Sequence, residues 1–232
     1  MGAGLNHMAP GLPGARARTS RIMRLLFATS NPHKIEEVQA ILAPLGIEVY
    51  GLDAIRPQPR EPVEDGATFE ANARIKAIAY AKATGRQCLA DDSGLEVDAL
   101  AGRPGVHSAR YAGIGATRAE RDAANNAKLL RELENLPINR RAARFVCAMC
   151  LADAQGNVQA ETRGEFPGII ARSPRGSNGF GYDPLLYLPD RQCTSAELST
   201  AEKNARSHRG AAARKMAETL QRASPTARGA TR

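Results

Sequence analysis

The chain has 232 residues, of which 43% are hydrophobic and 24% charged, a composition typical of a globular protein with a sizeable core. No apolar stretch approaches the ~20 residues that a membrane helix needs, and the first residues lack the apolar segment of a secretory signal, so we expect a cytoplasmic protein. The net charge is +8, but five positive charges lie in residues 1–23 and 223–232, which leaves +3 for the body and argues against a nucleic-acid-binding face.

The five positive charges at the two ends of the chain are all arginines. Residues 1–23 and 223–232 contain no acidic residue and no periodic apolar pattern. We expect a disordered leader over residues 1–23, a single domain over 24–222 and a disordered tail over 223–232.

The domain opens with a strand, a turn, a helix and a second strand. Residues 24–29 and 47–52 read as strands, and apolar residues between them recur at helical spacing. The turn carries polar side chains at the start of the helix, where free N–H groups attract anions. Ordinary capping and phosphate binding both explain this segment, which consists of Thr29, Ser30, Asn31, Pro32, His33 and Lys34.

A proline-rich loop and a second helix follow. The loop carries Glu64 and ends at Gly66, and the helix is expected over residues 68–84. Lys76 comes four residues after Asn72 and therefore shares its helix face. Surface helices commonly carry such residues, so this cluster is weak evidence by itself.

Two adjacent acids come directly after the next predicted strand, residues 87–91. Asp91 and Asp92 precede Ser93 and Gly94, and these residue types suit a turn that ends the strand. They also suit a metal or general-base site at the carboxyl end of a strand. Magnesium prefers one or two carboxylates together with phosphates and water, a set that Asp91, Asp92 and Glu64 would supply if their loops converge.

Residues 94–116 are expected to form a glycine-rich loop, and residues 117–136 a helix that begins with a capping box at Thr117 and Glu120. From residue 143 the hydrophobic period changes to two, which predicts a hairpin of 143–153 and 158–166. Cys147 and Cys150 would then lie on opposite faces of one strand, which disfavours a zinc site and favours small buried thiols, reduced in a cytoplasm.

The last part combines a glycine-rich loop, residues 173–189, with a helix that begins at a second capping box, Ser199 and Glu202. On an unbroken helix His208 and Arg209 would point away from Lys203. If these three side chains meet one ligand, the helix must break near 207–210, and we expect that break. Together the elements predict a mixed α/β fold around one sheet.

Five segments, in this order, resemble the inosine/xanthosine triphosphate pyrophosphatase family, the non-canonical purine triphosphate pyrophosphatases. They are FATSNPHKIEEV, EDGATFEANARIKA, ADDSGLEVDALAGRPGVHSARYAG, GFGYDPLLYLP and ELSTAEKNARSHRG, and they span about residues 24 to 215. The resemblance implies a mixed central sheet flanked by helices, two lobes with a nucleotide-binding cleft between them, and a homodimer. It also implies Mg²⁺-dependent hydrolysis of ITP, dITP and XTP to the monophosphate and pyrophosphate, which cleanses the nucleotide pool.

The resemblance also implies roles for residues of this chain. Asp92 would be the catalytic base, and Glu64 and Asp92 would lie at the metal. Asp91 would hold metal or orient Asp92. The expected substrate contacts are Thr29, Ser30, Asn31, Pro32, His33, Lys34, Lys76, Ser93, Phe180, Gly181, Tyr182, Asp183, Lys203, His208 and Arg209.

Two rival functions stay open at this point. A sugar-phosphate phosphatase would use an aspartyl nucleophile, although the adjacent acids lack the usual D-x-D spacing. A basic nucleic-acid-binding module would use the arginine-bearing ends, although an aromatic content of 4% offers little for base stacking.

Overall fold

The computed structural model describes residues 23–223, and within them one sheet of seven strands organises the fold. The strand order is β2-β1-β3-β4-β5-β6-β7. β1 is parallel to both of its neighbours, and all other pairs are antiparallel. The strands are β1 Met23–Phe27, β2 Ile47–Tyr50, β3 Cys88–Val97, β4 Ala142–Ala152, β5 Val158–Ile170, β6 Leu186–Leu188 and β7 Cys193–Thr194.

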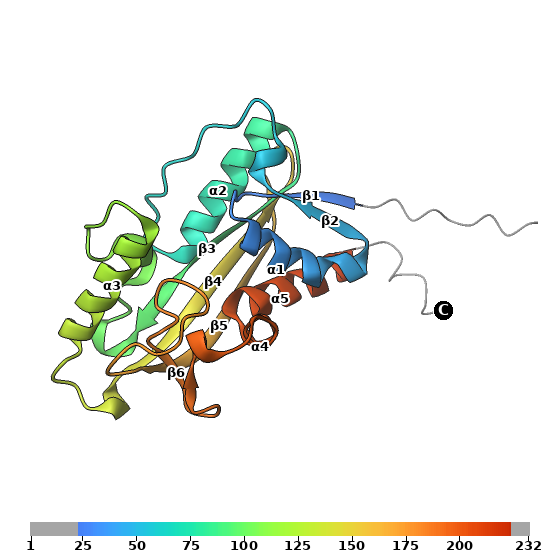
Figure 1. The fold of residues 1–232 in the computed structure, drawn as a ribbon. Coiled ribbons are helices and arrows are strands. Elements are labelled where there is room, and N and C mark those ends of the chain that lie inside the picture. The colour runs from blue at the N-terminus through green and yellow to red at the C-terminus, as the bar shows by residue number, and fades with distance from the viewer. Residues whose placement is uncertain (1–22, 224–232) are drawn as a thin grey trace, which may run out of the picture.

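Helices cover both faces of the sheet (Figure 1). α2 (Phe69–Thr84) packs on one face, whereas α1 (Pro32–Leu42) and α5 (His208–Ala223) pack on the other. α3 (Arg118–Glu132) and the short α4 (Thr200–Arg206) lie beside the part of the sheet where β4, β5 and β6 pair. A third apolar cluster joins α3 to the sheet there through Leu129, Phe145 and Ile170. The mixed α/β prediction is thus confirmed, while the division into two lobes stays a prediction.

The helix boundaries follow the local signals in the sequence. Asn31 caps α1 by accepting a hydrogen bond from His33 N, with Pro32 at the first helical position. Thr68 caps α2, and Gly85 ends it at φ +62°. Both predicted capping boxes form, at the start of α3 and at the start of α4.

Several expected element boundaries were wrong, among them those of β1, which ends at Phe27 rather than at 29, and of β5, which runs to Ile170 rather than to 166. β3 does not end at Asp91 but runs to Val97, because β4 pairs with it along its whole length, so residues 94–97 are strand rather than loop. α3 ends at Glu132 rather than near 136. β1 begins at Met23 and α5 ends at Ala223, so the domain extends one residue further at each end than expected. The rest of the predicted leader and tail lies outside the described residues.

Two further observations concern the cysteines and the membrane. Cys147 packs in the core beneath α1 and α5, whereas Cys150 packs beneath α2, so the two thiols lie on opposite faces of β4 as predicted. All four cysteines are free. Within residues 23–223, no helix combines the length and apolarity required to cross a membrane.

Candidate active site

The two adjacent acids lie in β3 immediately beyond the end of its neighbour β1. The last pair between these strands is Phe27 with Leu89, so β3 continues past β1 with Asp91 and Asp92. Because successive side chains of a strand point to opposite faces, Asp91 faces α1 and α5 while Asp92 faces α2. The two carboxylates therefore have separate environments although they are adjacent in the sequence.

Asp91 is buried in a network of cations and hydroxyls. Lys34 Nζ lies 2.9 and 3.0 Å from its two oxygens, Arg209 Nε lies 3.2 Å from Oδ2, and Ser93 Oγ donates to Oδ2 at 3.0 Å. Burial would raise the pKa of Asp91, but Lys34 and Arg209 outweigh it and hold that pKa well below its usual range. Asp91 is therefore ionised, fully engaged and poorly suited to accept a proton.

Asp92 has fewer partners and is less buried. Lys76 Nζ lies 3.3 Å from Oδ1, and Asn72 Nδ2 donates to Oδ2 at 3.2 Å. Burial raises the pKa of Asp92, with Lys76 opposing the shift. The predicted common face of Asn72 and Lys76 is confirmed, since both contact this carboxylate.

Lys76 also links Asp92 to Glu64. Its Nζ lies 2.8 Å from Glu64 Oε2. Nearby carboxylates raise the pKa of Lys76 although burial opposes this, so the ammonium is charged. No group of three or more metal-ligating side chains occurs in residues 23–223. Two carboxylates, Glu64 and Asp92, still fit Mg²⁺, because this ion takes its remaining ligands from water and phosphate.

The turn after β1 uses its side chains to cap α1. Thr29 Oγ1 accepts from Asn31 N at 3.1 Å, and Asn31 Oδ1 accepts from His33 N at 3.1 Å. His33 is exposed, and its Nδ1 lies 3.8 Å from Glu36 Oε2. Capping is thus present, and phosphate binding by Thr29, Ser30, Asn31 and Pro32 stays a prediction.

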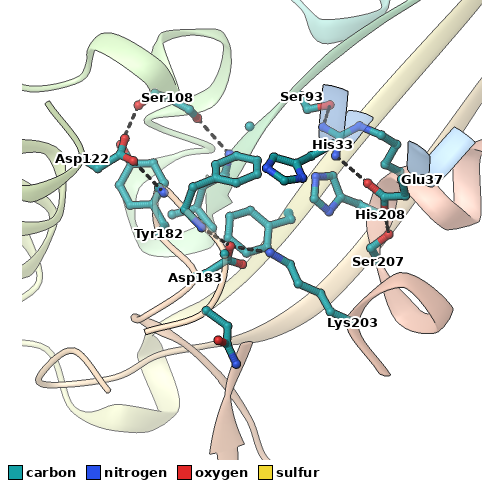
Figure 2. Close-up of a pocket in the computed structure, with 18 of the residues that line it drawn as sticks. His33, Glu37, Ser93, Ser108, Asp122, Tyr182, Asp183, Lys203, Ser207 and His208 are labelled. Carbon is teal, nitrogen blue, oxygen red and sulfur yellow. Dashed lines mark hydrogen bonds and ion pairs between the residues drawn. The ribbon is translucent and has the colours of Figure 1, made fainter. Parts of the chain in front are cut away.

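A cavity of about 510 Å³ (Figure 2) adjoins the Asp91 network, because Ser93 and Arg209 line the cavity and also contact Asp91. Nine of the predicted substrate contacts line it: His33, Ser93, Phe180, Gly181, Tyr182, Asp183, Lys203, His208 and Arg209. Arg209 joins the cavity to the acids, since it lines the former and contacts Asp91. The other predicted residues are not part of the lining. Lys34, Lys76, Glu64 and Asp92 belong to the charged networks around β3, and Thr29, Ser30, Asn31 and Pro32 form the capping turn.

The expected helix break brings the C-terminal residues together. α4 ends at Arg206, Ser207 has an extended backbone with ψ 150°, and α5 begins at His208. Ser207 Oγ accepts from Gly210 N at 2.9 Å and so caps the new helix. The predicted break is thus confirmed, and Lys203, His208 and Arg209 all line one cavity.

Asp183 organises the glycine-rich loop beside Lys203. Its Oδ2 lies 2.5 Å from Lys203 Nζ and 2.8 Å from Phe180 N, while Ser195 Oγ donates to Oδ1 at 2.7 Å. At Gly179 a Cβ would lie 2.1 Å from Asp183 Oδ2, and φ is +80°, so this position requires glycine. The Phe180 ring is 42% exposed, with Arg118 and Lys203 near it.

His208 presents a neutral ring to the cavity. Its ring stacks on Phe145 with centroids 5.2 Å apart, and its Nδ1 is buried without a hydrogen-bond partner among the described residues. Burial, reinforced by Arg209 and Lys203, lowers the pKa of His208 well below its ordinary value.

Several lining residues were missed by the sequence analysis. Glu37 accepts hydrogen bonds from Arg209 Nη1 at 2.9 Å and from Ser207 Oγ, and so joins α1 to α5. Its position three residues after Lys34, on the same helix face, was a usable signal. Ser108, Asp122 and Asn178 also line the cavity, and no local motif marks them.

Comparison with known proteins gives a consistent result. The model of the Ham1 family matches residues 25–219. A dITP/XTP pyrophosphatase of Nitratidesulfovibrio vulgaris is 52% identical over 200 residues, which cover 84% of this chain and 94% of the relative. The corresponding protein of Geobacillus kaustophilus is 48% identical over 194 residues, covering 84% of this chain and 92% of its own length.

Solved structures agree with these relatives. A HAM1 protein of Coxiella burnetii superimposes with a TM-score of 0.77 at 42% identity, covering 87% of this chain and all of its own (100%). A nucleoside-triphosphatase / dITP/XTP pyrophosphatase of Mycobacterium abscessus gives a TM-score of 0.69 at 45% identity, covering 85% of this chain and 99% of its own.

Proposed function

The chain belongs to the Ham1 family, and from this premise we propose that it hydrolyses ITP, dITP and XTP to the monophosphate and pyrophosphate. Its relatives named dITP/XTP pyrophosphatases match it over most of their length. One observation carries the proposal: a cavity of nucleotide-base size adjoins a buried cluster of cations and carboxylates, and Arg209 belongs to both. Such an activity keeps deaminated purines out of DNA and RNA.

The substrate would lie across the two parts of the site. The purine would occupy the cavity and stack on Phe180, and the triphosphate would extend over β3 toward Lys34 and Lys76. These ammonium groups reduce the repulsion between an incoming oxygen and the phosphate charge, and they stabilise the pentavalent transition state. The α1 N-terminus would add backbone donors to the phosphates.

Asp92 would act as the general base. Its raised pKa and its position near solvent favour proton acceptance, whereas Asp91 is fully engaged with Lys34 and Arg209. Asp92 would take a proton from water as the water oxygen bonds to the α-phosphorus. The bond from that phosphorus to the bridging oxygen would break, and pyrophosphate would leave with the electron pair.

Glu64 and Asp92 would hold Mg²⁺. When bound, the ion supplies positive charge to the phosphate oxygens. Lys76, which contacts both carboxylates, then orients the pair and holds Asp92 in place for proton transfer.

Base selection would depend on hydrogen bonding in the cavity. Hypoxanthine and xanthine present a 6-oxo acceptor, whereas adenine presents a 6-amino donor. Lys203 and Arg209 have N–H groups beyond those bonded to the carboxylates around them, and any such N–H directed at an amino group would lack an acceptor, at a cost of ~1–3 kcal/mol for each buried group. We therefore expect ATP to be a poor substrate, and GTP to be rejected at its 2-amino group.

The remaining expectations belong to this proposal. They are a homodimer, a cytoplasmic location and no function in binding nucleic acid. The rival phosphatase fits less well, because the two acids face opposite sides of β3 and Asp91 is enclosed by cations.

The substrate panel tests the proposal. Purified protein is incubated with Mg²⁺ and ITP, dITP, XTP, GTP or ATP, and the products are separated by anion exchange. We expect monophosphate and pyrophosphate in equal amounts, with ITP, dITP and XTP turned over fastest and EDTA abolishing turnover. Stepwise release of orthophosphate, or ATP or GTP as the best substrate, would contradict the proposal.

A further inference from the structure

One face of α3 is directed at the loop that carries Phe180. Arg118, Asp122 and Asn126 are spaced four residues apart, so they share a face of the helix. Asp122 Oδ2 accepts a hydrogen bond from Gly181 N at 2.9 Å, and Asn126 Nδ2 donates to Gly181 O at 3.0 Å. Both backbone polar groups of Gly181 are thus bonded to consecutive turns of one helix.

This loop needs outside support to keep one conformation. Gly179 and Gly181, on either side of Phe180, have φ of +80° and +62° and permit many backbone conformations in a free chain. Asp183 holds the loop at Phe180 N, on the side of Lys203. Asp122 and Asn126 hold the loop at Gly181 from the side of α3. Figure 2 shows Asp122 across the cavity from His208.

The Phe180 ring depends on the loop because its own packing is sparse. It is 42% exposed, and Arg118 Cζ lies 4.3 Å from its centroid. Arg118 is in turn close to Asp122, with Nε 3.9 Å from Oδ2. The backbone of the loop fixes the position of the Phe180 Cβ, from which the ring extends, so the contacts at Gly181 restrict the region that the ring can occupy.

One atom of Asn126 lowers the free energy of unfolding. Its Oδ1 is buried without a hydrogen-bond partner among the described residues, which costs free energy. An apolar side chain would avoid that cost but would lose the bond to Gly181 O. This separates a role in the loop from a role in folding.

We propose that Asp122 and Asn126, here called the α3 clamp, are positioning residues for base recognition: they fix Gly181 so that Phe180 is held ready to stack on a purine. The inference rests on the proposed function, because it takes a purine nucleotide as the ligand of the cavity. The clamp contacts the loop at Gly181. In the proposed function the phosphates are bound by Lys34, Lys76 and the acids of β3, and the clamp has no part in binding them.

The test compares Asp122→Ala, Asn126→Ala and Asn126→Leu with wild type. Asn135→Ala is the matched control, since it removes an exposed amide from the segment just after the same helix. Binding of IMP is measured by titration calorimetry, which needs no turnover. KM and kcat for ITP, inhibition by pyrophosphate, and the melting temperature complete the set.

For the clamp variants we expect IMP to bind about five- to tenfold more weakly, which corresponds to the free energy of one lost hydrogen bond. KM for ITP should rise by the same factor, whereas kcat should stay within twofold of wild type. Inhibition by pyrophosphate should stay within twofold of wild type, because it binds at the other end of the site. Asn126→Leu should keep or raise the melting temperature, and Asp122→Asn, which retains an oxygen acceptor, should recover most of the binding.

Three results would overturn the clamp. The first is that Asn126→Leu and Asp122→Ala bind IMP within twofold of wild type. The second is that the binding of IMP and the binding of pyrophosphate weaken equally in these variants. The third is that the wild-type protein does not bind IMP. Wild-type protein that binds IMP but does not hydrolyse ITP would instead contradict the proposed function and leave the clamp measurable. If Asp122→Ala fails to fold, the two Asn126 variants decide the matter.

Discussion

At the scale of single residues, the two acids of β3 differ in burial and partners, and the roles proposed for them rest on this difference. The resemblance to a family assigned the base to Asp92, but the residues alone could not separate Asp91 from Asp92, because adjacent identical residues carry no information about which face of a strand they occupy. In the structure Asp91 is 2% exposed and receives hydrogen bonds from three side chains, Lys34 of α1, Ser93 of β3 and Arg209 of α5. Asp92 has the raised pKa that suits a base.

Replacing each acid by asparagine should therefore have different effects. Asp92→Asn keeps the shape but cannot take a proton, so we expect kcat to fall by at least ~100-fold with little change in stability. Asp91→Asn leaves buried cations without their counter-charge, so we expect a loss of ~3–5 kcal/mol in the free energy of unfolding. Steady-state kinetics and urea unfolding measure the two effects. Near-normal turnover of Asp92→Asn, or unchanged stability of Asp91→Asn, would contradict the assignment.

His208 gives a pH-dependent stability. Its pKa in the folded protein is lowered well below the ordinary 6.5, so the unfolded chain binds the proton first as the pH falls. Stability should therefore decrease on acidification below about pH 6.5, by up to ~1.4 kcal/mol per pH unit. His208→Gln should remove this slope, measured by urea unfolding between pH 7.5 and 5.5. Equal slopes for wild type and His208→Gln would show that His208 is protonated as easily in the folded protein as in the unfolded chain, against the expectation.

At the scale of elements, the site depends on where β1, α4 and α5 end or begin. Because β1 ends at Phe27, Asp91 of β3 is free to interact with Lys34 of α1 and with Arg209 of α5. The break at Ser207 turns His208 and Arg209 into the cavity. α5 is then held against β5 at Gly164, where a Cβ would lie only 2.1 Å from His208 O.

Gly164→Ala should therefore disturb both stability and the site. The new methyl group would push the first turn of α5 from the sheet, and overpacking of this kind costs ~1–3 kcal/mol. Since His208 and Arg209 occupy that turn, we expect a higher KM for ITP as well as a lower melting temperature. Thermal unfolding and kinetics check it, and a variant with wild-type values in both would show that α5 does not need this close approach.

Much of the element pattern was predictable from the sequence, because it depends on neighbouring residues. Thr68 with Gly85, and the capping boxes at Thr117 and Ser199, marked helix ends correctly. The break at Ser207 followed from the requirement that Lys203 and Arg209 share a ligand. The continuation of β3 to Val97 was not predictable in this way, since residues such as Ser93 and Gly94 favour a turn locally and the pairing with β4 overrides them.

At the scale of the whole molecule, the proposed site brings three distant parts of the chain together beside β3: the start of α1, the middle of α2 with the loop before that helix, and the start of α5. Lys34, Lys76 and Arg209 come from these parts, and the first and third contact the same carboxylate. The resemblance to a family supplied most of these residues. It did not supply the wall of the cavity from α3, because Asp122 and Asn126 act through the backbone of Gly181, a partner that no sequence pattern reveals.

The central claim is that these groups direct one water molecule to the α-phosphorus of a purine triphosphate. Hydrolysis of ITP in ¹⁸O-labelled water, followed by mass spectrometry of both products, tests it directly. Attack at the α-phosphorus places the label in IMP and leaves pyrophosphate unlabelled, which is the result we predict. Label in pyrophosphate, or labelled orthophosphate as the first product, would contradict the account.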